Sequence, residues 1–252
     1  MTAPLRALLH QLIDYAGLYP PAGLPLASVI ENYERYRRSA DAWILNRLVL
    51  PAAKLGEVQP GEGWRITLLA DQEPGPLPPQ VETIETKGSH AFSLPTYCEV
   101  PLDKIESGYA KVRTGGLTPD AIPPASGLAD FIARAAMLRR PFKATAGLHH
   151  PIRSDRALTY AADSPRGVMH GFVNVFTAAA FAWHGENRDF ILDLLNETNP
   201  ATFDFSGEEL RWRGASLTAE QIAEARCDFA HSFGSCSFEE PLDDLRELGW
   251  LE

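Results

Sequence analysis

Short β-rich runs recur along this chain between helical or loop segments, and this rhythm constrains the fold more than any other feature. Such alternation is typical of a parallel sheet, because parallel neighbours need a long crossover connection. Seven runs are clear, at 12–17, 47–52, 64–71, 81–86, 96–101, 109–114 and 141–147. With 252 residues, the chain matches the roughly 250 that one (β/α)8 TIM barrel usually takes. We therefore predict a single α/β barrel domain over 1–252.

The eighth strand has two candidate positions. Either 170–176 is the strand, or that run opens a helix and the strand is 228–234. We favour the second position, because the segment EEPLDDLREL then follows as the closing helix. The stretch 151–226 becomes an insertion between the seventh and eighth strands, containing helices and a β-hairpin.

Some connections can be predicted from local patterns. Apolar residues at helical spacing indicate helices over 26–39 and 128–139. Four prolines in EPGPLPPQ predict a loop after the third strand. Within the insertion, FDFSGEELRWRG reads as a hairpin that turns near Ser206 and Gly207.

Composition indicates which binding partners and which cellular compartment to expect. The formal charge is −10, from 23 Lys and Arg against 33 Asp and Glu, so nucleic acid and anionic membranes are repelled overall. Three cysteines without a CxxC pair suggest neither a disulfide framework nor a thiolate zinc site. The N-terminal sequence lacks a signal-peptide pattern. We expect a cytoplasmic protein, with a homo-oligomer left open, that acts on a small and anionic molecule.

Charged residues gather near the carboxyl ends of the predicted strands. Strands of a parallel barrel should be almost wholly apolar, and an unpaired interior charge costs several kcal/mol. Charges there are tolerated when they are paired or face a wet mouth, which is also where such barrels place active sites. The residues concerned are Asp14, Asp71, Glu85, Glu99, Lys111, Arg113 and Lys143.

Three of these charges are cations on two successive strands. Lys111 and Arg113 are two residues apart, so both side chains lie on one face of their strand. Lys143 belongs to the next strand. Two ammonium groups on neighbouring strands repel each other, which lowers the pKa of one amine and yields a neutral nucleophile near pH 7. A Schiff base requires such an amine.

Three segments resemble deoxyribose-phosphate aldolase, a class I aldolase with a (β/α)8 barrel. They are LIDYAG in the first strand, AKVRTGG in the sixth and FKATAG in the seventh. The resemblance implies that Lys111 forms the imine and that Lys143 tunes it, with Glu85 near the place of that family's fourth-strand aspartate. Arg113 stands where the family has small polar residues, so we expect a different substrate, a small oxygenated carbonyl compound.

The predicted function is therefore that of an aldolase-like lyase that uses no cofactor and no metal. Four residues are predicted to be catalytic, namely Lys111, Lys143, Glu85 and Glu99. Five are predicted to bind substrate: Arg113, Asp14, His149 and His150 in the loop after the seventh strand, and Lys54 after the second.

Three alternatives remain open at this stage. The first is a metal-dependent hydrolase or lyase that uses His149 with carboxylates, since imidazole is a common metal ligand. The second is a barrel that binds an anionic metabolite through its basic mouth without catalysis. The third gives the lysines no chemistry at all, because an ion-pair network with Glu85 and Glu99 can simply fill the barrel end.

Overall fold

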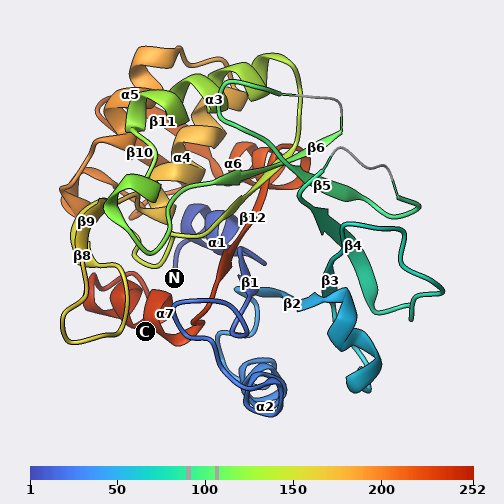
Figure 1. Cartoon of the computed structure of the whole chain (residues 1–252). Coiled ribbons are helices and arrows are strands. Elements are labelled where there is room, and N and C mark those ends of the chain that lie inside the picture. Colours follow the sequence, from blue (N-terminus) through green and yellow to red (C-terminus); the bar gives the residue numbers. More distant parts are fainter. Residues whose placement is uncertain (89–91, 106–107) are drawn as a thin grey trace.

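The computed structural model describes residues 1–88, 92–105 and 108–252. Its centre is a closed barrel of eight parallel strands in the order β1-β12-β7-β6-β5-β4-β3-β2 (Figure 1). The predicted fold class is thus confirmed. The barrel strands are β1 (Ile13–Tyr15), β2 (Leu45–Pro51), β3 (Ile66–Leu69), β4 (Val81–Thr86), β5 (Thr96–Glu99), β6 (Tyr109–Arg113), β7 (Phe142–Thr145) and β12 (Ala230–Ser235).

The eighth strand of the barrel is the second of the two predicted positions. β12 lies between β1 and β7 and closes the barrel. The competing run belongs to α4 (Phe172–Trp183), a helix buried along nearly its whole length. Helix α7 (Glu239–Glu247) follows β12, as the segment EEPLDDLREL predicts.

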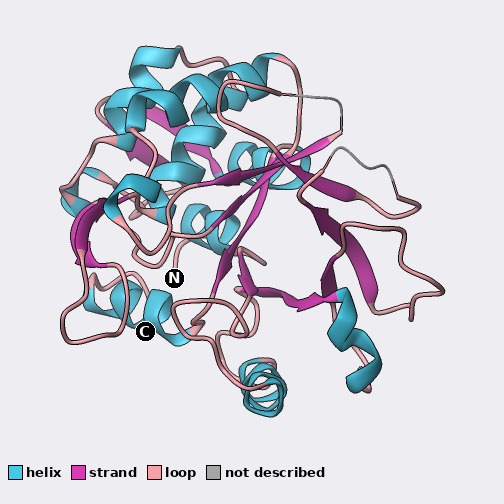
Figure 2. Cartoon of the chain, in the orientation of Figure 1, coloured by secondary structure: helices cyan, strands magenta, loops and turns pink. Residues whose placement is uncertain are grey.

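The helices cover the barrel unevenly (Figures 1 and 2). Helices α3 (Ala125–Met137), α4, α5 (Arg188–Leu195) and α6 (Ala219–Asp228) gather on one side, while α1 (Ala3–Leu9) packs against α6. Among the described residues, the chain from β2 to β6 contains only the short 3-10 helix η1 (Ala52–Glu57). The EPGPLPPQ segment is a loop, as its prolines predict.

Loops replace helices over the outer face of β3 and β4. Leu68 and Ile84 point away from the barrel interior, because their neighbours Leu69 and Glu85 line a cavity inside it. Both outward side chains are nevertheless fully buried. Apolar side chains such as Leu77 pack against the same core. This half of the barrel can therefore remain stable without a helical layer.

The segment between β7 and β12 carries two antiparallel hairpins. One pairs β8 (Ser154–Ala157) with β9 (Arg166–Met169), and the other pairs β10 (Glu209–Trp212) with β11 (Ala215–Thr218). The turn predicted at Ser206 and Gly207 is misplaced, because only one bridge, Asp204 to Arg211, forms around it. The hairpin turns instead at Arg213 and Gly214, whose φ angles are +45° and +86°. A left-handed backbone of this kind suits a tight turn that contains glycine.

No helix in the described part of the chain has both the length and the apolar character needed to cross a bilayer.

Candidate functional site

Lys143 is a deeply buried charge of the barrel, with 1% of its side chain exposed. It points inward from β7. Its Nζ donates hydrogen bonds to a carboxylate oxygen of Asp14 and, over 2.5 Å, to Oε1 of Glu85. Burial opposes the charged form, but the two carboxylates outweigh burial and raise the pKa of Lys143 above its ordinary value. Lys143 is therefore a fixed cation.

Asp14 completes this buried pair from β1. Its carboxylate accepts hydrogen bonds from Asn46 Nδ2 and Ser232 Oγ, each over 2.7 Å, and from the backbone N–H of Arg47 over 3.2 Å. Burial alone would raise the pKa of Asp14, but the charge and hydrogen bond of Lys143 and the other donors lower it. Asp14 is thus ionised and held in one orientation.

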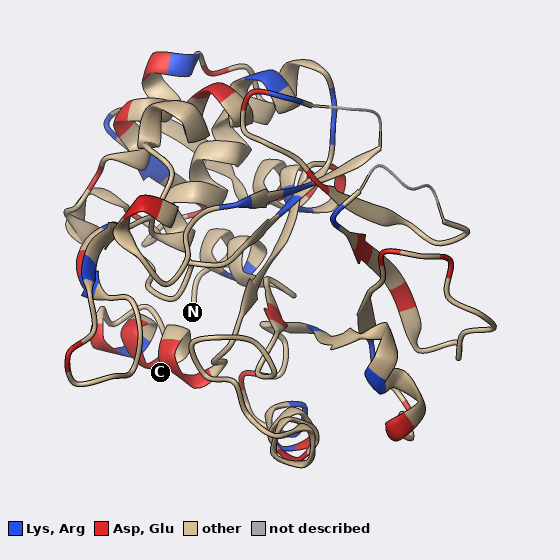
Figure 3. Ribbon diagram, viewed as in Figure 1, with Lys and Arg blue, Asp and Glu red and all other residues tan. Residues whose placement is uncertain are grey.

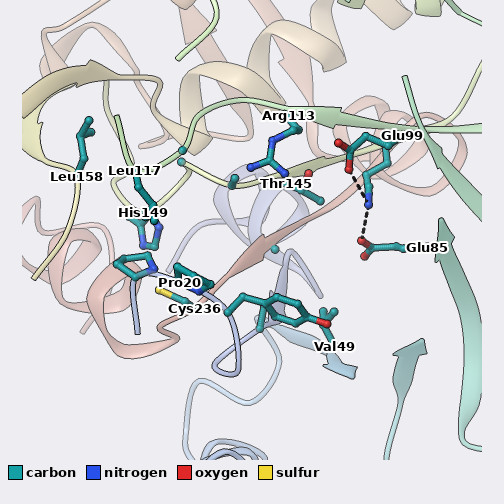
Figure 4. Close-up of a pocket in the computed structure, with 18 of the residues that line it drawn as sticks. Pro20, Val49, Glu85, Glu99, Arg113, Leu117, Thr145, His149, Leu158 and Cys236 are labelled. Atoms are coloured by element: carbon teal, nitrogen blue, oxygen red, sulfur yellow. Dashed lines mark ion pairs between the residues drawn. The ribbon is translucent and has the colours of Figure 1, made fainter. Parts of the chain in front are cut away.

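Lys111 lies beside Lys143 because the two residues are register partners in the β6–β7 pair. Its Nζ is 3.5 Å from Glu85 Oε2 and 3.0 Å from Glu99 Oε2, the two ion pairs dashed in Figure 4. Glu85 therefore contacts both lysines, one with each carboxylate oxygen. The three carboxylates of this network outnumber its two lysines, a balance that the sequence did not reveal.

A cavity of about 290 Å³ opens above this network. Its lining comes from the carboxyl ends of the barrel strands, as the sequence predicts for an active site. Lys111, Glu85, Glu99 and Arg113 belong to that lining, whereas Asp14 and Lys143 do not. The network thus has an upper tier in contact with the cavity and a sealed lower tier.

Arg113 is the free cation of the cavity. Its guanidinium projects toward the cavity from the end of β6 (Figure 4). Among described residues it forms no ion pair, and its side chain is exposed. It can therefore accept an anionic group without first giving up a partner.

The remaining predicted residues divide between this cavity and its surroundings. His149 lines the cavity and its Nδ1 is 3.0 Å from Glu240 Oε2. His150 pairs instead with Asp244 over 2.6 Å and faces a neighbouring groove along β8. Burial lowers the pKa of His150. Lys54 lies on η1, pairs with Glu57, and is not part of the cavity wall.

Tyr19 is a site residue that the sequence analysis did not single out. It belongs to the segment after β1 and lines the cavity. Its hydroxyl is buried without a hydrogen-bond partner among the described residues. Burial, with the nearby charge of Glu85, raises the pKa of Tyr19, so the hydroxyl keeps its proton. The position of this segment directly after a barrel strand was the signal that could have identified it.

The described residues contain no group of three or more His, Cys, Asp or Glu side chains arranged to hold a metal ion. His149, the proposed ligand, has one carboxylate partner, Glu240.

Fold and site together define a parallel (β/α)8 barrel with a buried lysine–carboxylate network below a cavity at the carboxyl ends of its strands. Comparison with known proteins adds nothing to this description: no family model matches the chain, and neither the curated proteins nor the solved structures contain a match.

Proposed function

We propose that the protein is a lyase of the class I aldolase type, which forms a Schiff base between Lys111 and a small oxygenated carbonyl compound. One observation carries the proposal. Of the two adjacent lysines, only Lys111 borders the cavity, while Lys143 is sealed beneath it by two carboxylates. A nucleophile has to reach the substrate, whereas a neighbouring cation that adjusts it does not.

The chemistry starts with a proton leaving Lys111. Glu99, 3.0 Å away and also in the cavity wall, is placed to accept it. The neutral amine then attacks the carbonyl carbon, and loss of water from the carbinolamine gives an iminium ion. A carboxylate of the network removes the proton of the β-hydroxyl, and the bond between the α- and β-carbons breaks. Its electron pair passes into the iminium, which leaves an enamine and releases an aldehyde. Protonation of the enamine and hydrolysis return the free lysine and the second product.

The lower tier, formed by Lys143 and Asp14, supplies fixed charges beneath the reacting amine. Lys143 stays charged on the neighbouring strand, next to Lys111. Glu85, shared by both lysines, is placed to move protons between the amine and the carbinolamine oxygen. Asp14 acts through Lys143 and so is a positioning residue instead of the substrate-binding residue that the sequence predicted.

The cavity wall indicates the kind of substrate. Arg113 offers a free guanidinium for a carboxylate or phosphate. The unpartnered hydroxyl of Tyr19 can donate to a substrate oxygen. At about 290 Å³, the space is at the lower end of the range for small-molecule sites. A compound of a few carbon atoms with one anionic group fits this description.

Borohydride trapping tests the proposal. The protein is incubated with a panel of small aldehydes and ketones, reduced with sodium borohydride and mapped by peptide mass spectrometry. The proposal predicts a reduced adduct on the peptide that carries Lys111. An adduct only on exposed lysines such as Lys104, or no adduct at all, contradicts it. Tight binding of an anionic carbonyl compound without any adduct would instead support the non-catalytic binding barrel.

A further inference from the structure

A second and larger cavity lies at the opposite end of the barrel. Its volume is about 780 Å³. Residues near the starts of β2, β3, β4 and β12 line it, including Arg47, Arg65, Glu82 and His231, and helices α1 and α6 form its rim. Among the residues that the structure describes, none lines both this cavity and the one at the carboxyl ends. The proposed lyase reaction makes no use of it.

The charge of this lining is opposite in sign to that of the whole chain. Four arginines face two carboxylates across the cavity, in a protein whose formal charge is −10. The arginines are Arg6, Arg47, Arg65 and Arg226, and the carboxylates are Glu82 and Glu220. A local excess of positive charge in a concave site attracts anions even when the overall field does not.

Two of these arginines converge on one carboxylate. Arg47 Nε is 2.8 Å from Glu82 Oε2, and Arg65 Nε donates to both Glu82 oxygens over 2.9 and 3.1 Å. A single negative charge thus serves two guanidinium groups. Nη1 of Arg65 has no hydrogen-bond partner among the described residues. The pair therefore retains one uncompensated positive charge and unused donors.

Arg226 adds a further charge that no carboxylate neutralises. It is buried, and among the described residues its guanidinium donates to backbone carbonyls and to no carboxylate. These carbonyls include those of Leu8 over 3.0 Å and His10 over 3.1 Å. Burial, followed by Arg6, Arg226 and Arg65, lowers the pKa of His10 on the cavity wall. Burial also lowers the pKa of His231 to about 4, so the positive charge of this lining is carried by its arginines.

We propose that this cavity is a binding site for a small phosphorylated metabolite, whose phosphate is held by the guanidinium groups of Arg47 and Arg65 next to Glu82. Guanidinium groups match phosphate oxygens with paired charge-assisted hydrogen bonds. Tyr97 and Tyr109 line the same cavity with their ring centroids 5.3 Å apart, and they offer an aromatic surface to the remainder of the ligand.

The new site is joined to the first one by direct contacts. Asn46 lines the amino-end cavity, and its side chain holds Asp14, which in turn holds Lys143. Tyr97 also lines that cavity and places its ring 5.7 Å from Lys143 Nζ. Binding at the amino end is nevertheless measured separately from the reaction at the carboxyl end, so either proposal can fail without the other.

Isothermal titration of the whole protein with inorganic pyrophosphate tests the site, with the variants Arg65→Gln and Glu82→Gln. We expect saturable binding to the unmodified protein and a loss of affinity of about tenfold or more in Arg65→Gln, which removes a charged donor. Glu82→Gln should bind severalfold more tightly, because the competing carboxylate is gone. This gain keeps the test decisive if Arg65→Gln folds poorly.

Arg188→Gln is the matched control, since Arg188 pairs with Asp130 on the surface and lies outside both cavities. It should bind pyrophosphate as the unmodified protein does. The proposal is overturned if pyrophosphate does not bind at millimolar concentration, if Arg65→Gln and Arg188→Gln bind equally, or if Glu82→Gln binds more weakly.

Discussion

The two ends of this barrel differ in the balance between their cationic side chains and their carboxylates. At the carboxyl end two lysines share three carboxylates, and each lysine has two of them within ion-pair distance. At the amino end arginines outnumber carboxylates in the cavity lining. One of these arginines, Arg226, donates to backbone carbonyls and to no described carboxylate. Figure 3 shows Lys, Arg, Asp and Glu on the barrel strands as well as on the surrounding helices and loops. The carboxyl-end network keeps Lys143 and Asp14 ionised, whereas the amino end offers positive charge to an anion.

The largest effect should come from Lys111. Replacing it with Met removes the only amine of the network that borders the cavity. We expect carbonyl trapping to be lost and turnover of a responsive substrate to fall on the order of a thousandfold or more. Lys104→Met, at an exposed position outside the cavity, should behave as the unmodified protein. If Lys111→Met and Lys104→Met lost trapping and turnover equally, the special role of Lys111 would be contradicted.

Lys143→Met at the carboxyl end should lower the free energy of unfolding more than Arg47→Met does at the amino end. It leaves Asp14 and Glu85 buried with one partner fewer, and such a change typically costs about 3–5 kcal/mol of unfolding free energy. Arg47→Met at the amino end leaves Glu82 still paired with Arg65 in a partly exposed site, so about 1 kcal/mol is expected. Urea unfolding of both variants measures the difference. Similar costs would show that the carboxyl-end network is no more tightly coupled than the other.

The amino end should also confer a pH dependence. Burial, followed by the charge of Arg226, lowers the pKa of His231 to about 4. Because the unfolded chain takes up this proton near pH 6.5 and the folded chain does not, the free energy of unfolding falls as pH drops from about 6.5 to about 4, by about 3 kcal/mol for this group. His231→Gln should flatten that decline in urea titrations. An unchanged slope would mean that His231 is protonated in the folded state.

Arg113 should give the smallest effect. It contacts substrate in the proposal but belongs to no ion pair among the described residues. Arg113→Met should therefore raise KM about tenfold for an anionic substrate, with kcat nearly unchanged. A neutral substrate analogue is the internal control, since its KM should not change. A fall in kcat with constant KM would place Arg113 in the chemical step instead.

Much of the fold could be predicted from the sequence, because the spacing of the strands and the alternation of side chains along each strand are local properties of the chain. The register of β6 and β7 then brings Lys111 and Lys143 side by side, as predicted. The pairing of Asp14 with Lys143 could not be predicted, because β12 lies between their strands and the two side chains meet only inside the closed barrel. That pairing holds Lys143 in its charged form.

The amino-end cavity escaped sequence analysis for a different reason. Arg47 is the third residue of β2 and Arg65 directly precedes β3, and a charged residue near the start of a strand usually indicates a solvent-exposed position. Their convergence on Glu82 depends on the stagger of three neighbouring strands. The misplaced hairpin turn has a related origin, since Ser206–Gly207 and Arg213–Gly214 offer similar turn chemistry and strand pairing selects between them.

The central claim is that Lys111, and not its neighbour Lys143, is the amine that reacts. A crystal structure of the protein after borohydride reduction with a responsive carbonyl compound tests it most directly. We predict electron density continuous with Lys111 Nζ and extending toward Arg113, with Lys143 still between Asp14 and Glu85. Density joined to Lys143, or an unmodified Lys111 still paired with Glu99, would contradict the account.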